Sequence, residues 1–253
     1  MPKAEKLEEA VHKLRQQILN GEFGARGQLP ARSDLEKELN IPHSTMSQVI
    51  LQLQGEGLIA HSGNRRLHAL LPRKRVPTRN IPFTRFLKEQ GLEPITEYIE
   101  SPERLPMDVE LAKDFGVSTG TLYAARIRRD GTKQSWYRVT SKYFLGSLID
   151  EQTLAAMQNN DRHDVIMDIK TKLDITAQFM AEDIIARLPS SREQELLSIA
   201  RYAPVQEITR TCYNKDPNEG GTVLWLNRIV LVASLFVTHY EYVGEALWKE
   251  SGA

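Results

Sequence analysis

What the chain lacks limits the classes of protein it can belong to. Cys212 is its single cysteine, so no disulfide forms within the chain and a reducing compartment is expected. None of its six histidines pairs with that cysteine at the spacing of metal ligands. The most apolar run, Ile229 to Val237, is too short to span a bilayer, and the charged N-terminus has no signal-peptide core. We therefore expect a cytoplasmic protein without a metal, a cofactor or a membrane partner.

Positive and negative charges balance over the whole chain but not along it. Each sign contributes 33 side chains, and 253 residues are enough for two ordinary domains. Residues 1–79 hold 13 Lys and Arg against 8 Asp and Glu, whereas the remainder holds 20 against 25. A positive first part suits a partner that carries phosphates, although many domains that bind no nucleic acid have a similar excess.

Helices are predicted throughout the first 55 residues. Apolar residues spaced by four, three and four positions predict a helix over residues 3–20, which Asn20-Gly21 ends. Leu29-Pro30 opens a second helix, since proline is tolerated in a first turn. Pro42 begins a third helix, whose inward side chains are expected to be Met46, Val49, Ile50 and Leu53.

The outward face of this third helix is polar, with small side chains and almost no acid. An ordinary surface helix would carry Glu and Lys there, so the face suits phosphates and base edges; the alternative is a plain solvated face. Two short strands follow at 58–61 and 67–71, with a turn and two arginines between them. A winged helix-turn-helix is predicted, and its expected DNA-binding residues are Arg32, His43, Ser44, Thr45, Ser47, Gln48, Gly63, Asn64, Arg65 and Arg66.

Residues 73–80 are basic, non-periodic and interrupted by proline, which is typical of a linker. The first domain accordingly spans residues 1–72, and a second domain spans 81–245. In the second domain short helices separate alternating strands, and Asp130-Gly131 predicts the turn of a hairpin. The expected fold class is α+β, with an antiparallel sheet in the second domain.

The first 70 residues resemble the winged helix-turn-helix of the GntR family of bacterial transcription regulators. The order and spacing of the following residues carry the resemblance: Leu14, Ile18, Gly21-Glu22, Leu29-Pro30, Asp34-Leu35, Leu39, Ser44-Thr45, Leu53, Glu56-Gly57-Leu58-Ile59 and Gly63. Two arginines of the family's recognition helix are replaced here by His43 and Ser47. The arginine that the family carries shortly after Leu-Pro stands one position early here, at Arg32. Because arginine makes the strongest base contacts, these changes imply a different operator or weaker binding.

Residues 81–242 resemble the UTRA domain of the HutC subfamily, whose fold is similar to that of chorismate lyase. This resemblance rests on Phe83-Thr84, Gly91, the 122–131 segment, Tyr143, Ile184, Ala186-Arg187 and Thr209-Arg210. Together the two resemblances imply a homodimeric repressor that binds a palindromic operator on double-stranded DNA. They also imply that a small-molecule effector, bound in the second domain, releases the repressor.

The effector site that the resemblance implies suits an anion, such as a sugar phosphate or a carboxylate. Thr84 at a helix start and the pair Arg126 and Arg128 fit this because helix-start N–H groups and guanidinium groups donate to anions. The alternative for the arginines is a surface ladder of charges paired with acids. Trp225 is either a stacking wall or a core residue. The expected effector-binding residues are Phe83, Thr84, Arg126, Arg128, Tyr143, Arg210 and Trp225.

Two alternatives to this function remain open at the level of sequence. Glutamates that are common in the family are absent at Thr140 and near Leu224-Trp225, so the second domain could serve dimerisation alone. The other alternative is an enzyme on the chorismate-lyase-like fold. We expect no catalytic residues, because the chain has no nucleophile elbow, phosphate-binding loop, dinucleotide fingerprint or metal cluster.

Overall fold

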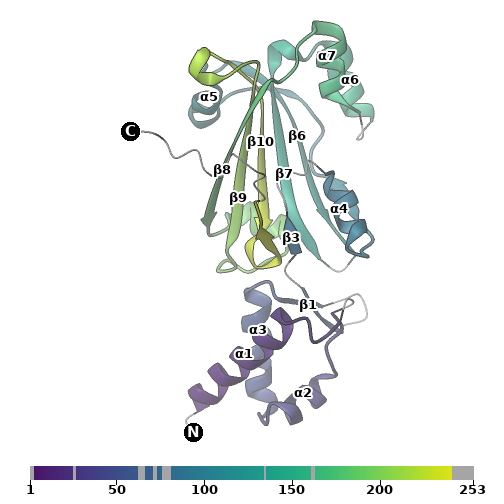
Figure 1. The fold of residues 1–253 in the computed structure, drawn as a ribbon, viewed down its shortest axis with the longest axis vertical. Helices are drawn as coiled ribbons and strands as arrows, with labels where there is room; N and C mark the ends of the chain where they lie inside the picture. Colours follow the sequence, from purple (N-terminus) through teal and green to yellow (C-terminus); the bar gives the residue numbers. More distant parts are fainter. Residues whose placement is uncertain are drawn as a thin grey trace, which may run out of the picture.

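The computed structural model describes residues 3–24, 27–61, 66–70, 73–75, 81–133, 135–160 and 163–240. It shows two units placed end to end along the longest axis of the molecule (Figure 1). The first unit contains helices and a small hairpin, and the second contains a large sheet with helices on both faces. The predicted α+β fold class is confirmed.

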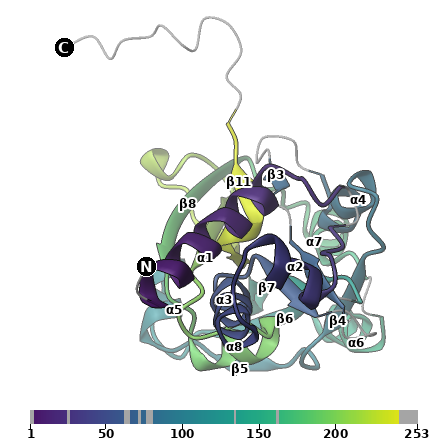
Figure 2. The same ribbon diagram turned by 90° about the horizontal axis from the view of Figure 1, so that it is seen from below.

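The first unit is built on the helices α1 (Lys3–Leu19), α2 (Arg32–Glu38) and α3 (His43–Gly55), which overlie the sheet when the molecule is seen from below (Figure 2). The strands β1 (Ile59–His61) and β2 (Leu67–Ala69) pair antiparallel beside them. The apolar stripes of the helices meet in one core, whose fully buried members include Leu14, Ile18, Leu35, Met46 and Leu53. Hydrophobic periodicity therefore predicts these helices correctly.

A seven-stranded sheet forms the centre of the second unit in the described part of the chain. Its strand order is β4-β6-β7-β10-β9-β8, with β5 also paired to β6, and the pairings are antiparallel. The strands span Ile95–Tyr98 (β4), Arg104–Pro106 (β5), Leu122–Gly131 (β6), Trp136–Leu145 (β7), Phe179–Arg187 (β8), Val205–Tyr213 (β9) and Val223–Val232 (β10). The predicted hairpin is present as β6 and β7, but its turn follows Gly131, because Asp130 and Gly131 themselves pair with Arg138 and Trp136 as the last residues of β6. The register shifts at a bulge between these two residues.

The two faces of this sheet differ in character, since successive side chains of a strand point to opposite faces. One face presents Arg126 and Arg128 of β6 with Lys142 of β7, and we call it the arginine face. The other presents Tyr123 of β6 and Tyr143 of β7, and we call it the tyrosine face. Arg126 is paired directly with Lys142, and directly paired residues of antiparallel strands share a face.

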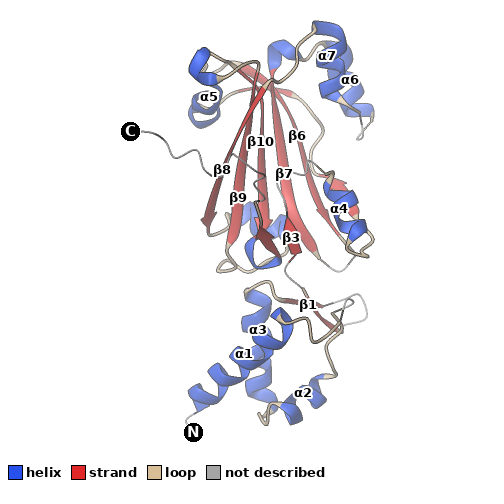
Figure 3. Ribbon diagram, viewed as in Figure 1, coloured by secondary structure: helices blue, strands red, loops and turns tan. Residues whose placement is uncertain are grey.

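Helices cover both faces near the ends of the strands (Figure 3). The arginine face carries α4 at the end near the first unit and the pair α6 and α7 at the other end. The tyrosine face carries α5 and α8. The bounds are Phe83–Glu89 (α4), Val109–Phe115 (α5), Glu151–Asn159 (α6), Val165–Leu173 (α7) and Ser191–Leu197 (α8), with 3-10 turns at Gly146–Leu148, Pro217–Glu219 and Ala233–Leu235. The row of cations described below lies between the two ends of the arginine face.

Two short strands depart from the sequence expectation. The first residues of the expected linker form β3 (Arg73–Arg75), which pairs in parallel with β11 (Phe236–Thr238). Residues 76–80 of that linker lie outside the described residues. Strand β5 was not expected either. Both strands are three residues long, which is too short for an alternating pattern to mark them.

The two units touch through the turn that follows α3. Gly55 packs against the ring of Tyr202. Gly57 has a φ of +70°, and a Cβ atom there would come within 2.8 Å of the Ser234 hydroxyl oxygen and 2.9 Å of a Val232 methyl group. A cavity of about 520 Å³ adjoins this contact, and both units contribute to its lining, which includes Ile59, Leu70, Trp136, Leu197, Ile199 and Leu235. The end of α3 is therefore seated directly on the sheet domain.

Candidate nucleic-acid and ligand sites

The exposed face of α3 begins at the end of the helix away from the sheet. Gly55 meets the sheet domain, so His43 at the start of the helix lies roughly 18 Å farther away. Four predicted DNA-binding residues are exposed on this face: His43, Ser44, Ser47 and Gln48. Leu51, which the sequence pattern did not single out, shares the face at a spacing of four from Ser47 and is 63% exposed. An apolar side chain there suits contact with a thymine methyl group.

Thr45 does not belong to this face, and the prediction that its side chain points outward was wrong. Its side chain is only 1% exposed. The buried stripe of α3 runs through positions 45, 46, 49, 50 and 53, so Thr45 lies one turn before Val49 on the inward side. A hydroxyl group at this position suggested a polar face, but helical periodicity decides where the side chain points.

Arg32 of α2 supplies a positive charge to the exposed face of α3, which has no lysine or arginine of its own. Its Nη2 group donates to the carbonyl oxygen of His43 at 2.9 Å and to the Ser47 hydroxyl. Glu36 of α2 accepts a hydrogen bond from Arg32 Nε at 3.2 Å, and the same carboxylate oxygen lies 2.8 Å from Nδ1 of His43. The two helices thus present one connected polar cluster.

A groove of about 550 Å³ lies between the start of α2 and the base of the hairpin. It is lined by Gln28, Leu29, Pro30, Ala31, Arg32, Ile50, Arg66 and Leu67. Arg66 is exposed. Two arginines beside a helix start suit a phosphate backbone. The predicted contacts Gly63, Asn64 and Arg65 lie outside the described residues.

Cations gather in the centre of the arginine face. Along one row across the sheet, Arg126, Lys142, Asn227 and Arg210 are paired on adjacent strands. Arg128 lies two residues from Arg126 and is paired with a threonine. Directly paired side chains have Cβ atoms about 5 Å apart. The structure therefore brings three of the predicted effector residues, Arg126, Arg128 and Arg210, onto one face.

Carboxylates balance only part of this charge. Glu182 pairs with Arg210 at 2.6 Å. Asp130, which has no exposed surface, lies 2.7 Å from Arg138 and 3.5 Å from Arg128. Burial raises the pKa of Asp130, but the charges of Arg138 and Arg128 outweigh that effect and hold the pKa below its ordinary value.

Lys142 is the residue of this site that the sequence analysis missed. Among the described residues its ammonium group has no hydrogen bond or ion pair, and it lies 5.1 Å from the ring centre of Phe144 and 5.8 Å from that of Trp225. Burial lowers the pKa of Lys142 to about 8, and the charges of Arg128 and Arg126 add to this effect. From the sequence, Lys142 can be placed opposite Arg126 only if the register of the β6–β7 hairpin is known. The bulge shifts that register by an amount that the sequence pattern does not reveal.

A second polar group beside Lys142 is also unsatisfied. The Oγ1 atom of Thr140, directly opposite Arg128, is buried and has no hydrogen-bond partner among the described residues. Buried polar groups without partners are costly, so a ligand that accepts hydrogen bonds from Lys142 and Thr140 would stabilise both. The arrangement suits a small anion.

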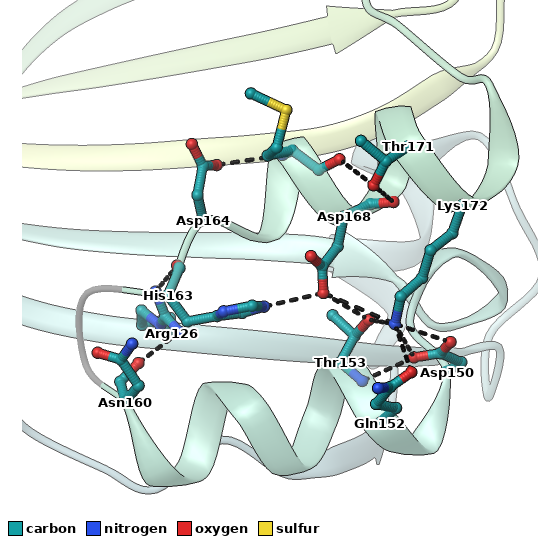
Figure 4. Close-up of polar contacts among 11 residues, drawn as sticks. Arg126, Asp150, Gln152, Thr153, Asn160, His163, Asp164, Asp168, Thr171 and Lys172 are labelled. Carbon is teal, nitrogen blue, oxygen red and sulfur yellow. Dashed lines mark hydrogen bonds and ion pairs between the residues drawn. The ribbon is translucent and has the colours of Figure 1, made fainter.

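The connection between α6 and α7 is tied to Arg126 (Figure 4). Arg126 donates to the carbonyl oxygen of His163 at 2.8 Å. His163 Nε2 lies 2.9 Å from the carboxylate of Asp168, which also accepts a hydrogen bond from Thr153 at 3.0 Å. Burial raises the pKa of Asp168, but these hydrogen bonds outweigh it and hold the pKa below its ordinary value. A ligand that engages Arg126 would therefore act on both helices at that end of the sheet.

The remaining predicted residues of the arginine face occupy its two ends. Phe83 and Thr84 begin α4, where the centre of the Phe83 ring lies 3.9 Å from the guanidinium carbon of Arg138. Trp225 is 4% exposed and packs in the core with residues of α6 and α7. The core alternative for Trp225 is therefore the better description, although its ring also contacts Lys142.

Tyr143 lies on the tyrosine face, with the sheet between it and the arginines. Its ring forms an edge-to-face pair with Tyr123 at 5.7 Å between centroids. These rings line a separate cavity of about 500 Å³, together with Glu100, Ser101, Glu103, Leu105, Ala125, Ile127 and Arg192. Burial raises the pKa of Tyr123, and the neighbouring Tyr143 adds to the effect. The structure does not bring Tyr143 together with the other predicted effector residues.

Three further observations concern metal ligands, membrane helices and the single cysteine. The described residues contain no group of three or more His, Cys, Asp or Glu side chains that could hold a metal ion. None of the described helices is long and apolar enough to cross a membrane. Cys212 is buried and free, and burial raises the pKa of its thiol.

Comparison with known families divides the chain in the same way as the structure. The profile described as "Bacterial regulatory proteins, gntR family" matches residues 6–67. The profile described as "UTRA domain" matches residues 89–225. The first match covers the helices and hairpin of the first unit, and the second covers most of the large sheet with α5 to α8.

Relatives agree with these matches over almost the whole chain. An uncharacterized HTH-type transcriptional regulator of Streptomyces coelicolor is 27% identical over 264 residues, covering 95% of this chain and 94% of the relative. The crystal structure of PhnF from Mycobacterium smegmatis has the same fold, with a TM-score of 0.57 and 16% identity over 93% of this chain and 100% of its own. YydK of Bacillus subtilis has a TM-score of 0.51 and 13% identity over 94% and 99% of the two chains. The chain belongs to the GntR family of transcriptional regulators, with a DNA-binding winged helix-turn-helix joined to a UTRA ligand-binding domain.

Proposed function

We propose that this protein is a cytoplasmic repressor of the HutC subfamily that binds a palindromic operator as a homodimer. An anionic small molecule bound on the arginine face releases it from DNA. The observation that carries the proposal is Lys142, a half-buried cation without a hydrogen bond or ion pair among the described residues, directly opposite Arg126. The names of the relatives, which are those of transcriptional regulators, support a function without catalysis.

The DNA contacts come from the polar cluster at the start of α3 and from the hairpin. His43, Ser44, Ser47 and Gln48 face outwards, and Arg32 lies across them from α2. Arg66 lines the groove beside α2, and Gly63, Asn64 and Arg65 at the hairpin turn complete the proposed contacts. In a dimer, two such clusters about 34 Å apart would enter successive major grooves of a palindrome.

The effector is a small carboxylate or phosphate, such as a sugar phosphate. Arg126, Arg128 and Lys142 supply charge in one patch, and the hydroxyl of Thr140 supplies a further donor. Phe83 and Thr84 at the start of α4 limit the site at one end, and α6 and α7 limit it at the other. Charge-assisted hydrogen bonds from guanidinium and ammonium groups are the strongest contacts that such an anion can make.

A regulator whose UTRA domain only dimerises is the second candidate. Arg126 already donates to a backbone carbonyl, and Arg210 already pairs with Glu182, so part of the charge is satisfied within the chain. Thermal shift of the full chain against sugar phosphates and small carboxylates separates the two candidates. A ligand raises the melting temperature by mass action, and the absence of any hit across both classes favours the dimerisation-only candidate.

Selection of operator DNA tests the regulatory proposal itself. Full-length protein is used to enrich binding sequences from random double-stranded DNA, and gel retardation then measures the enriched fragment against scrambled DNA. We expect a palindromic motif whose retardation persists in moderate salt. Retardation that is equal for both DNAs and lost in salt would contradict a specific operator.

A further inference from the structure

At the start of α3, an exposed histidine is held by a carboxylate of α2. His43 is the first residue of the helix, and its side chain is 73% exposed. Its Nδ1 atom lies 2.8 Å from Oε1 of Glu36, whose side chain is only 21% exposed. Glu36 is also held by Nε of Arg32 at 3.2 Å. The carboxylate therefore has a fixed place beside one particular nitrogen of the imidazole.

This contact determines which nitrogen carries the proton. An ionised carboxylate only accepts hydrogen bonds, so Nδ1 of His43 must be the donor in the contact with Glu36. In a neutral imidazole the other nitrogen, Nε2, is then an acceptor. Among the described residues Nε2 has no hydrogen-bond partner, and the exposed ring leaves it open to an approaching molecule.

We propose that Glu36 fixes His43 in the Nδ1–H form, so that Nε2 accepts a hydrogen bond from the exocyclic amino group of adenine or cytosine in the major groove. The inference rests on the proposed function, because it requires α3 to lie in that groove. Among the groups that bases present there, the adenine N6 and cytosine N4 amino groups are the donors. An acceptor on the protein discriminates these groups from the O6, N7 and O4 acceptors of the other base edges.

Arg32 complements this acceptor with a donor. Its Nη2 group is used by the carbonyl of His43 and the hydroxyl of Ser47, and its Nε atom by Glu36. Its Nη1 group has no partner among the described residues and is available to a base acceptor or a phosphate oxygen. Glu36 contacts both side chains and thus holds an acceptor, Nε2 of His43, beside a donor, Nη1 of Arg32.

Nuclear magnetic resonance of full-length protein labelled with nitrogen-15 histidine tests the tautomer without DNA. Two-bond proton–nitrogen correlations are recorded well above the ordinary pKa of histidine, and the His43 signals are assigned by their loss in His43→Ala. We expect protonated Nδ1 and unprotonated Nε2 in the wild type, and a mixture in Glu36→Gln, because an amide can donate as well as accept. Glu38→Gln, which removes a carboxylate of the same helix that contacts Gln17, is the matched control. A predominant Nε2–H form in the wild type would overturn the proposal.

Base analogues in the selected operator test the reading. At the base pair whose identity no longer matters to His43→Ala, an analogue that lacks only the amino group should weaken wild-type binding roughly two- to ten-fold, as expected for one hydrogen bond. It should leave His43→Ala unchanged. An equal loss in both proteins, or a loss only when N7 is replaced by carbon, would overturn the role of His43. Failure to select any operator would instead contradict the proposed function, whatever tautomer the resonances show.

Discussion

At the scale of single residues, Lys142 is the most informative side chain of the UTRA domain. Burial and nearby arginines lower its pKa to about 8, so its charge is present below that pH and lost above it. Binding of an anionic ligand should therefore weaken as pH rises through about 8. Isothermal titration calorimetry of a thermal-shift hit over this range measures the effect.

Lys142→Gln should reduce the affinity for the same anion roughly ten- to hundred-fold, because a charged hydrogen bond is lost. It should also remove the pH dependence near 8. The matched control is Lys170→Gln, which removes an exposed lysine from α7. If Lys142→Gln and Lys170→Gln bind the anion equally well, Lys142 is not part of the site.

Asp130 is the residue on which the geometry of the arginine face depends. Asp130→Asn leaves the nearly buried Arg138 without its carboxylate and should lower the free energy of unfolding by about 3–5 kcal/mol. The pKa of Asp130 in the folded protein is lowered, so its contribution is present at neutral pH and is lost as pH falls through the folded pKa. Urea unfolding of both proteins at neutral and acidic pH measures this, with the exposed Asp183→Asn as control. Equal losses for the two variants would contradict the assignment.

At the scale of elements, the turn after α3 connects the proposed DNA-binding helix to the large sheet of the second unit. Gly57→Ala introduces a side chain at positive φ and places it against Val232 and Ser234. Gly24→Ala has a similar strain, with a φ of +65°, but open space around it. We expect Gly57→Ala to uncouple the two domains, so that ligand binding stays normal while operator affinity responds less to ligand. Operator titrations with and without ligand measure this, and an equal response of the two glycine variants would contradict it.

How much of this fold the sequence predicts depends on the length of each element. The helices of the first unit follow from their apolar stripes, and the β6–β7 hairpin follows from Asp130-Gly131. Strands β3 and β5 are too short to give a pattern, and β3 has its partner near the end of the chain. Local sequence patterns therefore predict the long elements and miss the short strands that pair with distant parts of the chain.

The candidate ligand site was also predictable only in part, because strand period can be counted from the sequence and the pairing between strands cannot. The period of two placed Arg126 and Arg128 on one face, as observed. Grouping Tyr143 with them required the register across a bulged hairpin, and the structure puts that ring on the other face. Lys142 was missed because only the pairing of the strands shows that it lies half-buried opposite Arg126. For Thr45 no tertiary information was needed, because the helical period alone places its side chain in the buried stripe of α3.

At the scale of the whole molecule, the proposed function requires a dimer. One chain has a mass of 28.8 kDa, and sedimentation of the full chain should give twice that value with or without ligand. A palindromic operator presents two equivalent half-sites, so a dimer should bind it far more tightly than a single half-site. A chain that sediments as a monomer at the concentration of the DNA titration would contradict binding as a preformed dimer.

The most direct test of the central claim joins the two sites in one measurement. Fluorescence anisotropy of labelled operator is followed while the anion found by thermal shift is added to wild type, Lys142→Gln and Lys170→Gln. We predict that ligand weakens operator binding by the wild type and Lys170→Gln about 5- to 150-fold, the range of typical coupling between sites. Lys142→Gln should bind the operator normally and no longer respond to ligand at the same concentrations. Operator affinity that ligand leaves unchanged in the wild type, or an unaltered response in Lys142→Gln, would contradict the account.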